Sequence, residues 1–191
     1  MINHSAHCGT HTLAARGSDM YETPPCAVRS LLEVETLPSG AVWEPACGRG
    51  NILRVCSTSS AIAPTPPTCN DYGTPEQDAA GIDFLWATGS VPCFIGSIVT
   101  NPPYRLAGEF VCHALTICPR VCMLLRLAFL ESERRSAILD NGWLARVHVF
   151  RKRLPTMHRE GWTGPRASSA IAFAWFVWDR DHEGPARLDR I

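Results

Sequence analysis

Apolar positions along the chain follow two patterns, short continuous runs and residues repeated at helical spacing. Continuous runs rich in β-branched and aromatic residues predict strands, here at residues 41–43, 96–101, 120–127, 145–153 and 170–179. Apolar residues at helical spacing predict helices at 27–37, 51–59, 105–118 and 132–142. A further strand is expected within 58–73, although Pro64, Pro66 and Pro67 interrupt that segment.

The alternation of strands with helices predicts an α/β sheet that carries helices on both faces. The run at 170–179 is apolar almost throughout, which is typical of a strand buried on both sides. In such sheets ligands bind beyond the carboxyl ends of the strands. Polar or glycine-rich segments follow three of the expected strands, at 44–48, 71–72 and 101–104. We therefore expect them to converge on one crevice.

Composition places the chain among ordinary globular proteins. Its 191 residues, 46% of them hydrophobic and 19% charged, suit one domain, which we expect over 19–191 after a disordered leader at 1–18. No apolar run approaches the roughly 18 residues of a membrane span, and the N-terminus lacks a signal core. Nine cysteines without a CxxC pair favour a reducing cytoplasm. The spacing of His4, His7, Cys8 and His11 matches no zinc pattern, so no metal is expected.

Charge is balanced overall but unevenly distributed. The net charge is zero, yet the segment 146–166 holds six basic residues and two histidines against the single acid Glu160. Such a segment is either a local phosphate-binding face or a solvated arginine-rich surface.

The stretch EPACGRG places Gly48 and Gly50 between an expected strand and an expected helix. Glycines there permit a tight turn and close approach of the backbone to a ligand. A dinucleotide site would need a third glycine where Leu53 stands, which weakens that interpretation. Asp71 follows at the distance where an acid binds ribose hydroxyls, and Asp83 with Phe84 could meet an adenine ring.

The stretch TNPPY follows the expected strand at 96–101. Proline ends a strand because it has no backbone N–H and a fixed φ, and it restricts the residue before it. Asn101-Pro102-Pro103-Tyr104 is therefore a stiff segment that holds an amide, a carbonyl and an aromatic ring in fixed relation.

Taken together, YETPP, EPACGRG and NPPY resemble the motifs of class I S-adenosylmethionine-dependent DNA adenine-N6 methyltransferases, in particular small phage-type enzymes with the gamma motif order. The likeness runs from about Asp19 to Asp179. It implies a Rossmann-like fold with a mixed, mostly parallel seven-stranded sheet. It also implies a cytoplasmic enzyme of bacterial or phage origin, of the kind found in restriction–modification.

The resemblance also implies which residues hold the methyl donor S-adenosylmethionine, which becomes S-adenosylhomocysteine. Tyr21, Thr23 and Pro24 would line its methionine end, together with Glu44 and the turn that follows. Asp71 would hold the ribose, and Asp83 and Phe84 the adenine. The full expected set is Tyr21, Thr23, Pro24, Glu44, Ala46, Cys47, Gly48, Gly50, Asp71, Tyr72, Asp83, Phe84 and Asn101.

NPPY matches the catalytic motif of the same family. Asn101 and the Pro102 carbonyl would accept hydrogen bonds from the target amine, Pro103 would stiffen the segment, and Tyr104 would stack on an adenine rotated out of DNA. No separate target-recognition domain is evident in the sequence. The expected DNA contacts are Arg105, Arg151, Lys152, Arg153, Arg159 and Arg166. The DNA could be double- or single-stranded, and the protein a monomer or homodimer.

Other interpretations stay open. The same motif serves enzymes that methylate RNA adenine or the N4 amine of cytosine. A non-catalytic subunit that binds cofactor or DNA is a different class of protein, and the intact Asn101 and Tyr104 argue against it. An α/β domain of unrelated function is the remaining alternative.

Overall fold

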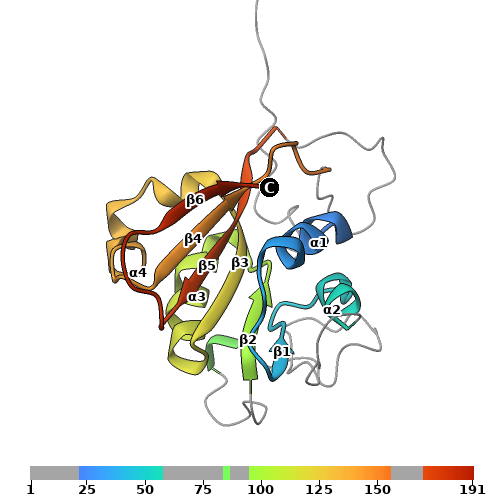
Figure 1. Ribbon diagram of the computed structural model, residues 1–191, viewed down its shortest axis with the longest axis horizontal. Coiled ribbons are helices and arrows are strands. Elements are labelled where there is room, and N and C mark those ends of the chain that lie inside the picture. The colour runs from blue at the N-terminus through green and yellow to red at the C-terminus, as the bar shows by residue number, and fades with distance from the viewer. Residues whose placement is uncertain (1–21, 58–83, 87–94, 156–169) are drawn as a thin grey trace, which may run out of the picture.

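The computed structural model describes residues 22–57, 84–86, 95–155 and 170–191, and its centre is one twisted sheet (Figure 1). The strands are β1 (Ala41–Trp43), β2 (Ile95–Thr100), β3 (Arg120–Arg126), β4 (Leu144–Val149), β5 (Phe173–Asp179) and β6 (Arg187–Arg190). The helices are α1 (Pro25–Val34), α2 (Asn51–Cys56), α3 (Ala107–Ile117) and α4 (Ser136–Leu139). Short 3₁₀ turns lie at Phe84–Trp86, Tyr104–Leu106, Leu127–Leu130 and Glu133–Arg135.

The strand order is β1-β2-β3-β5-β4-β6, and one strand runs against the others. β1, β2 and β3 are parallel neighbours, and β4 and β6 are parallel to each other. β5 lies between β3 and β4 and is antiparallel to both. All strands except β5 therefore end at the same edge, which we call the carboxyl edge.

Two apolar layers cover the two faces of the sheet. Figure 1 shows α1 and α2 on one side, and α3 and α4 on the other. Alternate residues of each strand point into opposite layers. On β5, for example, Trp175 and Val177 pack in the α1–α2 layer, whereas Phe176 and Trp178 pack in the α3–α4 layer. Both buried indoles find acceptors, Trp175 on the Ala27 carbonyl and Trp178 on the Ile138 carbonyl.

Most of the expected elements are present. The expected α/β sheet with helices on both faces is confirmed, and all seven residues of β5 are buried, as its apolar run predicts. No strand is predicted after 170–179, but the structure has one there, because β6 follows β5 as an edge strand. The described sheet has six strands against seven expected, and the strand expected within 58–73 lies outside the described residues.

A buried network of charges joins the end of α1 to the sheet. The Glu35 carboxylate, 7% exposed, accepts hydrogen bonds from Arg146 and Arg120 and lies 2.7 Å from His148 Nε2. Arg120 also pairs with Asp179 at the end of β5. Arg146 and His148, which the sequence places in the basic segment, are thus turned inward to Glu35. The face that could bind phosphate begins only after them.

No helix within the described ranges combines the length and apolar character needed to cross a bilayer.

Candidate active site

Two of the motif segments lie side by side because their strands are neighbours. β1 and β2 are parallel, with Trp43 opposite Ile98, so the chain leaves both strands at the carboxyl edge. The segment 44–50 follows β1 and the segment 101–104 follows β2. The expected convergence of these two segments is therefore what the strand pairing produces. The third segment, Asp71-Tyr72, lies outside the described residues.

The turn after β1 depends on its glycines. Gly48 and Gly50 adopt φ values of 49° and 78°, a left-handed backbone conformation that is costly for residues with a Cβ. The Gly50 N–H donates to the Cys47 carbonyl at 2.7 Å, which closes the turn. Gly50 is also the residue that precedes α2, and its carbonyl accepts the first helical bond from Arg54 N–H. The backbone of this turn is thus fixed at the amino end of a helix.

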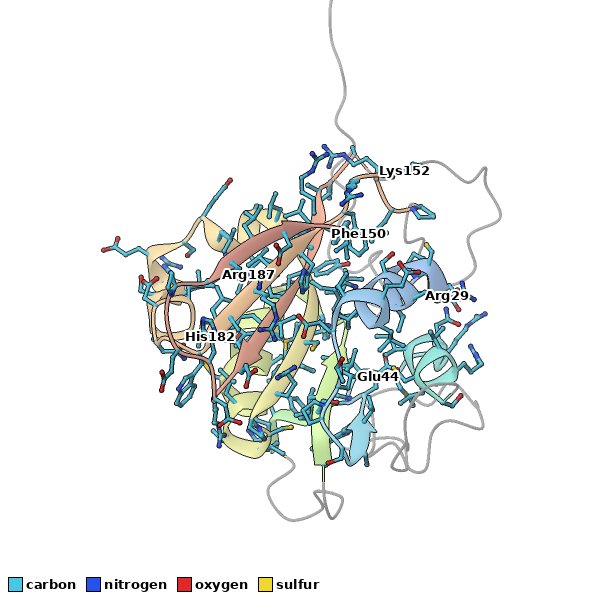
Figure 2. The ribbon with its side chains drawn as sticks, viewed as in Figure 1. Arg29, Glu44, Phe150, Lys152, His182 and Arg187 are labelled. Atoms are coloured by element: carbon cyan, nitrogen blue, oxygen red, sulfur yellow. The ribbon has the colours of Figure 1, made fainter. Side chains whose placement is uncertain are left out.

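Glu44 is a buried carboxylate at the start of this turn. Its residue is 2% exposed, and it lies just past the end of β1 (Figure 2). Burial, together with the negative charge of Glu44, raises the pKa of the Cys56 thiol to about 12. The raised pKa keeps the Cys56 thiol protonated and unreactive. Burying a charged carboxylate costs free energy unless the group is paired or hydrogen-bonded.

The N-terminal motif is tied to the same helix. Thr23 is 6% exposed, and its backbone carbonyl accepts a hydrogen bond from the Asn51 side chain at 3.1 Å. The side-chain oxygen of Asn51 accepts a hydrogen bond from the Arg54 guanidinium at 2.7 Å. Pro24, in extended conformation, precedes the first residue of α1. Residues 23–24 therefore sit beside the glycine turn although more than twenty residues separate them in sequence.

The segment 101–103 leads from β2 directly into a 3₁₀ turn. Asn101 and Pro103 are half-buried and Pro102 is buried, and Tyr104 opens a 3₁₀ turn whose Leu106 N–H bonds the Pro103 carbonyl. The Tyr104 ring is also half-buried.

Two side chains from neighbouring strands contact the Tyr104 ring. The Phe173 ring centroid, at the start of β5, lies 5.8 Å from that of Tyr104. The guanidinium carbon of Arg126, at the end of β3, lies 4.7 Å from the Tyr104 centroid. β2, β3 and β5 thus each contribute one group to a cluster at the carboxyl edge.

Phe84 belongs to the core. It is 2% exposed and packs against the rings of Trp43, Phe110 and His113. The distances between ring centroids are 5.4 Å, 4.9 Å and 4.7 Å, respectively. These contacts anchor the segment next to Asp83 against α3. Its expected role beside an adenine ring stays a prediction.

Several expected site residues lie outside the described ranges, namely Tyr21, Asp71, Tyr72, Asp83, Arg159 and Arg166. Among the described basic residues, Arg105 follows Tyr104 directly, and Arg151, Lys152 and Arg153 follow β4; all four are exposed. Both positions are at the carboxyl edge, and Figure 2 shows Lys152 at the end of the molecule away from His182. The Arg151 guanidinium donates to the Arg190 carbonyl at 2.9 Å, which ties this segment to β6.

Sequence reasoning missed two residues of this region. Asn51 links the glycine turn to residue 23, and a polar side chain at the first position of a helix is a signal that could have found it. Arg126 ends a buried strand and lies over Tyr104. Only its position near the end of an apolar run distinguishes it in the sequence, and its partner depends on which strands are neighbours.

No protein-family model matches the sequence, and no match is found among curated proteins. Solved structures do match. A proposed RNA methyltransferase from Pyrococcus horikoshii aligns with a TM-score of 0.58 at 12% identity, covering 84% of this chain and 86% of that one. A 23S rRNA methyltransferase aligns with a TM-score of 0.54 at 16% identity, covering 85% of this chain and 70% of that one. A methyltransferase subunit of a type I restriction–modification system from Streptococcus thermophilus aligns at 0.57 and 15%, covering 85% of this chain and 45% of that one.

These likenesses, all under 20% identity, show the fold. The chain has the Rossmann-like fold of class I methyltransferases, with a mixed sheet in which one antiparallel strand lies among parallel ones. The proteins that share it act, by their descriptions, on RNA or belong to a DNA restriction–modification system.

Proposed function

We propose that this protein is a methyltransferase that transfers a methyl group from S-adenosylmethionine to the N6 amine of adenine in DNA. The observation that carries the proposal is the pairing of β1 with β2. It sets the glycine turn, which suits a cofactor, beside Asn101-Pro102-Pro103-Tyr104, which suits a planar amine. The shared fold of the matched methyltransferases supports the same class of reaction.

The residues at the first segment fit the methyl donor. S-adenosylmethionine is a cation at sulfur, and its methionine end carries an ammonium group. The buried Glu44 carboxylate supplies a matching negative charge, and the backbone of Gly48 and Gly50 leaves room for close approach. Leu53 is buried where a dinucleotide site would require glycine. The donor set therefore favours this cofactor over a dinucleotide.

Asn101 and Pro102 supply what the amine of adenine lacks. The nitrogen lone pair of that amine is delocalised into the ring, so it is a weak nucleophile. The Asn101 side-chain oxygen and the Pro102 carbonyl accept hydrogen bonds from its two hydrogens and draw the nitrogen toward tetrahedral geometry, which frees the lone pair. When bound, the cofactor presents its methyl group on a positive sulfur. Alignment of this kind is worth about 7–11 kcal/mol of the barrier.

Tyr104 completes the site by stacking on the base. An adenine in a duplex must leave the stack before its amine can be reached, at a cost of a few kcal/mol. Stacking on an aromatic ring returns about 1–3 kcal/mol of that cost. Basic residues at the same edge, Arg105 and those at 151–153, would bind the flanking phosphates.

The test is methylation of unmethylated DNA with a labelled methyl donor, followed by analysis of the nucleosides. We expect label in N6-methyladenine. Asn101→Ala should lower single-turnover methylation by several orders of magnitude with little change in cofactor and DNA affinity, because its contact matters mainly as the amine becomes tetrahedral. Asn101→Asp keeps an acceptor and should retain part of the rate. A wild-type rate in Asn101→Ala would refute the mechanism.

RNA adenine is a second candidate substrate. The observation that favours it is that two of the matched structures are described as RNA methyltransferases. Running the same assay with unmodified ribosomal and transfer RNA distinguishes the two substrates. Label in RNA alone would assign the chemistry to RNA.

A further inference from the structure

The half-buried Tyr104 ring contacts one buried aromatic ring and one exposed cation. Phe173 is 6% exposed and belongs to the core, and its ring centroid lies 5.8 Å from that of Tyr104. Arg126 is exposed, and its guanidinium carbon lies 4.7 Å from the ring centroid. The guanidinium thus lies over a face of the Tyr104 ring, and a nucleobase that stacked on that face would have to displace it.

The contacts of Arg126 differ from those of Arg120 and Arg146, the other arginines of β3 and β4. Arg120 and Arg146 are paired with Glu35. Within the described ranges, Arg126 has no carboxylate in ion-pair contact; the ring of Tyr104 is its described partner. A cation–π contact at an exposed site is weaker than the stacking of a base on the same ring. A base can therefore displace the guanidinium.

We propose that Arg126 exchanges partners when substrate binds. In the free protein its guanidinium lies on Tyr104. When the base takes that place, the guanidinium moves to a phosphate beside the rotated nucleotide, whose oxygens match its planar set of donors. This inference rests on the proposed function, to which it adds a substrate-contacting residue. Arg105, exposed and next to Tyr104, makes the surroundings favourable for that phosphate.

The experiment measures two properties of one complex, the protein with S-adenosylhomocysteine and a short single-stranded oligodeoxyadenylate that carries one fluorescent adenine analogue. Base stacking on Tyr104 quenches the analogue, and the salt dependence of affinity counts phosphate contacts. For Arg126→Gln we expect a slope smaller by about one and an affinity several-fold lower, with the quench at saturation unchanged. Arg126→Lys keeps the charge and should restore the slope.

Two variants serve as controls. Arg187→Gln removes one positive charge at the start of β6, at the end of the strands opposite to the carboxyl edge. It should change neither the salt slope nor the quench. Tyr104→Ala should lose the quench.

Two outcomes would overturn the inference. An unchanged slope in Arg126→Gln means that the guanidinium meets no phosphate. A lost quench means that it only holds the Tyr104 ring in place. Wild-type protein that binds no oligodeoxyadenylate, and methylates neither DNA nor RNA, would refute the proposed function and this inference with it. Methylation by wild type with an unchanged slope would refute this inference alone.

Discussion

Single residues at the carboxyl edge owe their proposed roles to burial as much as to chemical type. Glu22 and Glu44 are both acids in motif segments, but Glu22 forms an exposed ion pair with Arg49 at 3.4 Å, whereas Glu44 is 2% exposed. An exposed ion pair contributes little to stability because solvent screens it. The charge of a buried carboxylate is screened much less, so its interaction with a nearby ligand is stronger.

Glu44→Gln keeps the shape of the side chain and removes its charge. We expect the affinity for S-adenosylhomocysteine to fall at least tenfold, since a hydrogen bond to a charged group is worth about 1.5–3 kcal/mol. Calorimetric titration measures the change. Glu22→Gln is the matched control and should bind as wild type does. Equal affinities in Glu44→Gln and wild type would remove Glu44 from the cofactor site.

The residue scale is also where the sequence is least complete as a guide. Asn101, Tyr104 and the two glycines each follow a strand that its own apolar run defines, so the sequence indicates their position at the carboxyl edge, while their roles stay predictions. Arg146 and Arg126 could not be assigned in this way. Whether a basic residue faces solvent, a carboxylate 111 positions away or an aromatic ring depends on strand order and register, which the local pattern does not encode.

Among the elements, β2 is held at its start by a close backbone approach. A Cβ at Gly96 would lie 2.6 Å from the Ser39 carbonyl oxygen and 2.9 Å from that of Pro38. Backbone cannot move aside as a flexible side chain does. Glycine is therefore required where the chain before β1 crosses the start of β2.

Gly96→Ala should lower the free energy of unfolding by about 1–3 kcal/mol, the usual cost of forced overpacking. Gly108→Ala, in the first turn of α3, is the control with the opposite sign. No atom lies within 4 Å of a Cβ there, and alanine favours a helix by about 0.5–1 kcal/mol. Denaturant unfolding of both variants measures these two changes in the free energy of unfolding. A Gly96→Ala protein as stable as wild type would show that residues 38–39 yield at little cost.

α1 is joined to the sheet through its last charge. Glu35→Gln leaves Arg120 and Arg146 without their shared carboxylate, and removing one partner of a buried network costs about 3–5 kcal/mol. Glu33→Gln, exposed on the same helix, should stay within about 0.5 kcal/mol of wild type. Equal stabilities of the two variants would mean that the network contributes nothing net.

The same carboxyl predicts a dependence of stability on pH. Burial raises the pKa of Glu35, but hydrogen bonds from His148 and Arg146 outweigh burial and hold it below its ordinary value of 4.5. A pKa depressed in the folded state gives stability that is present above pH 4.5 and is lost as the pH falls through the folded value. The free energy of unfolding, measured from neutral to acidic pH, should fall less steeply for Glu35→Gln than for wild type. Parallel profiles would contradict this.

At the level of elements, sequence prediction succeeded where a strand is apolar and failed where it is not. β2, β3 and β5 were found by their continuous apolar runs. β6 was missed because Arg187–Arg190 alternates charged residues around one leucine that is 63% exposed. The antiparallel direction of β5 has no local signal, since a strand buried on both faces is apolar in either direction. The helix expected at 132–142 was overestimated, because Glu133–Arg135 forms a 3₁₀ turn and α4 itself has only four residues.

In the whole molecule, α1 connects two regions with different tasks. Its first turn follows Thr23 and Pro24 beside the glycine turn, and Glu35 at its other end lies over Arg120, the first residue of β3. The proposed cofactor site and Glu35 of the charged network are thus at opposite ends of one helix.

Cofactor binding should therefore stabilise the fold by an amount that does not depend on the network. A ligand at about a hundredfold excess over its dissociation constant adds about 2.7 kcal/mol to the free energy of unfolding. We expect S-adenosylhomocysteine to add this increment to wild type and to Glu35→Gln alike, because effects at separate sites without shared partners add. NAD should add none, since Leu53 fills the place of the third glycine. Unfolding curves of the two proteins with each ligand measure the increments. Stabilisation by NAD would contradict the assignment of the glycine turn to a methyl donor, and a smaller increment in Glu35→Gln would show that α1 transmits the state of the network to the site.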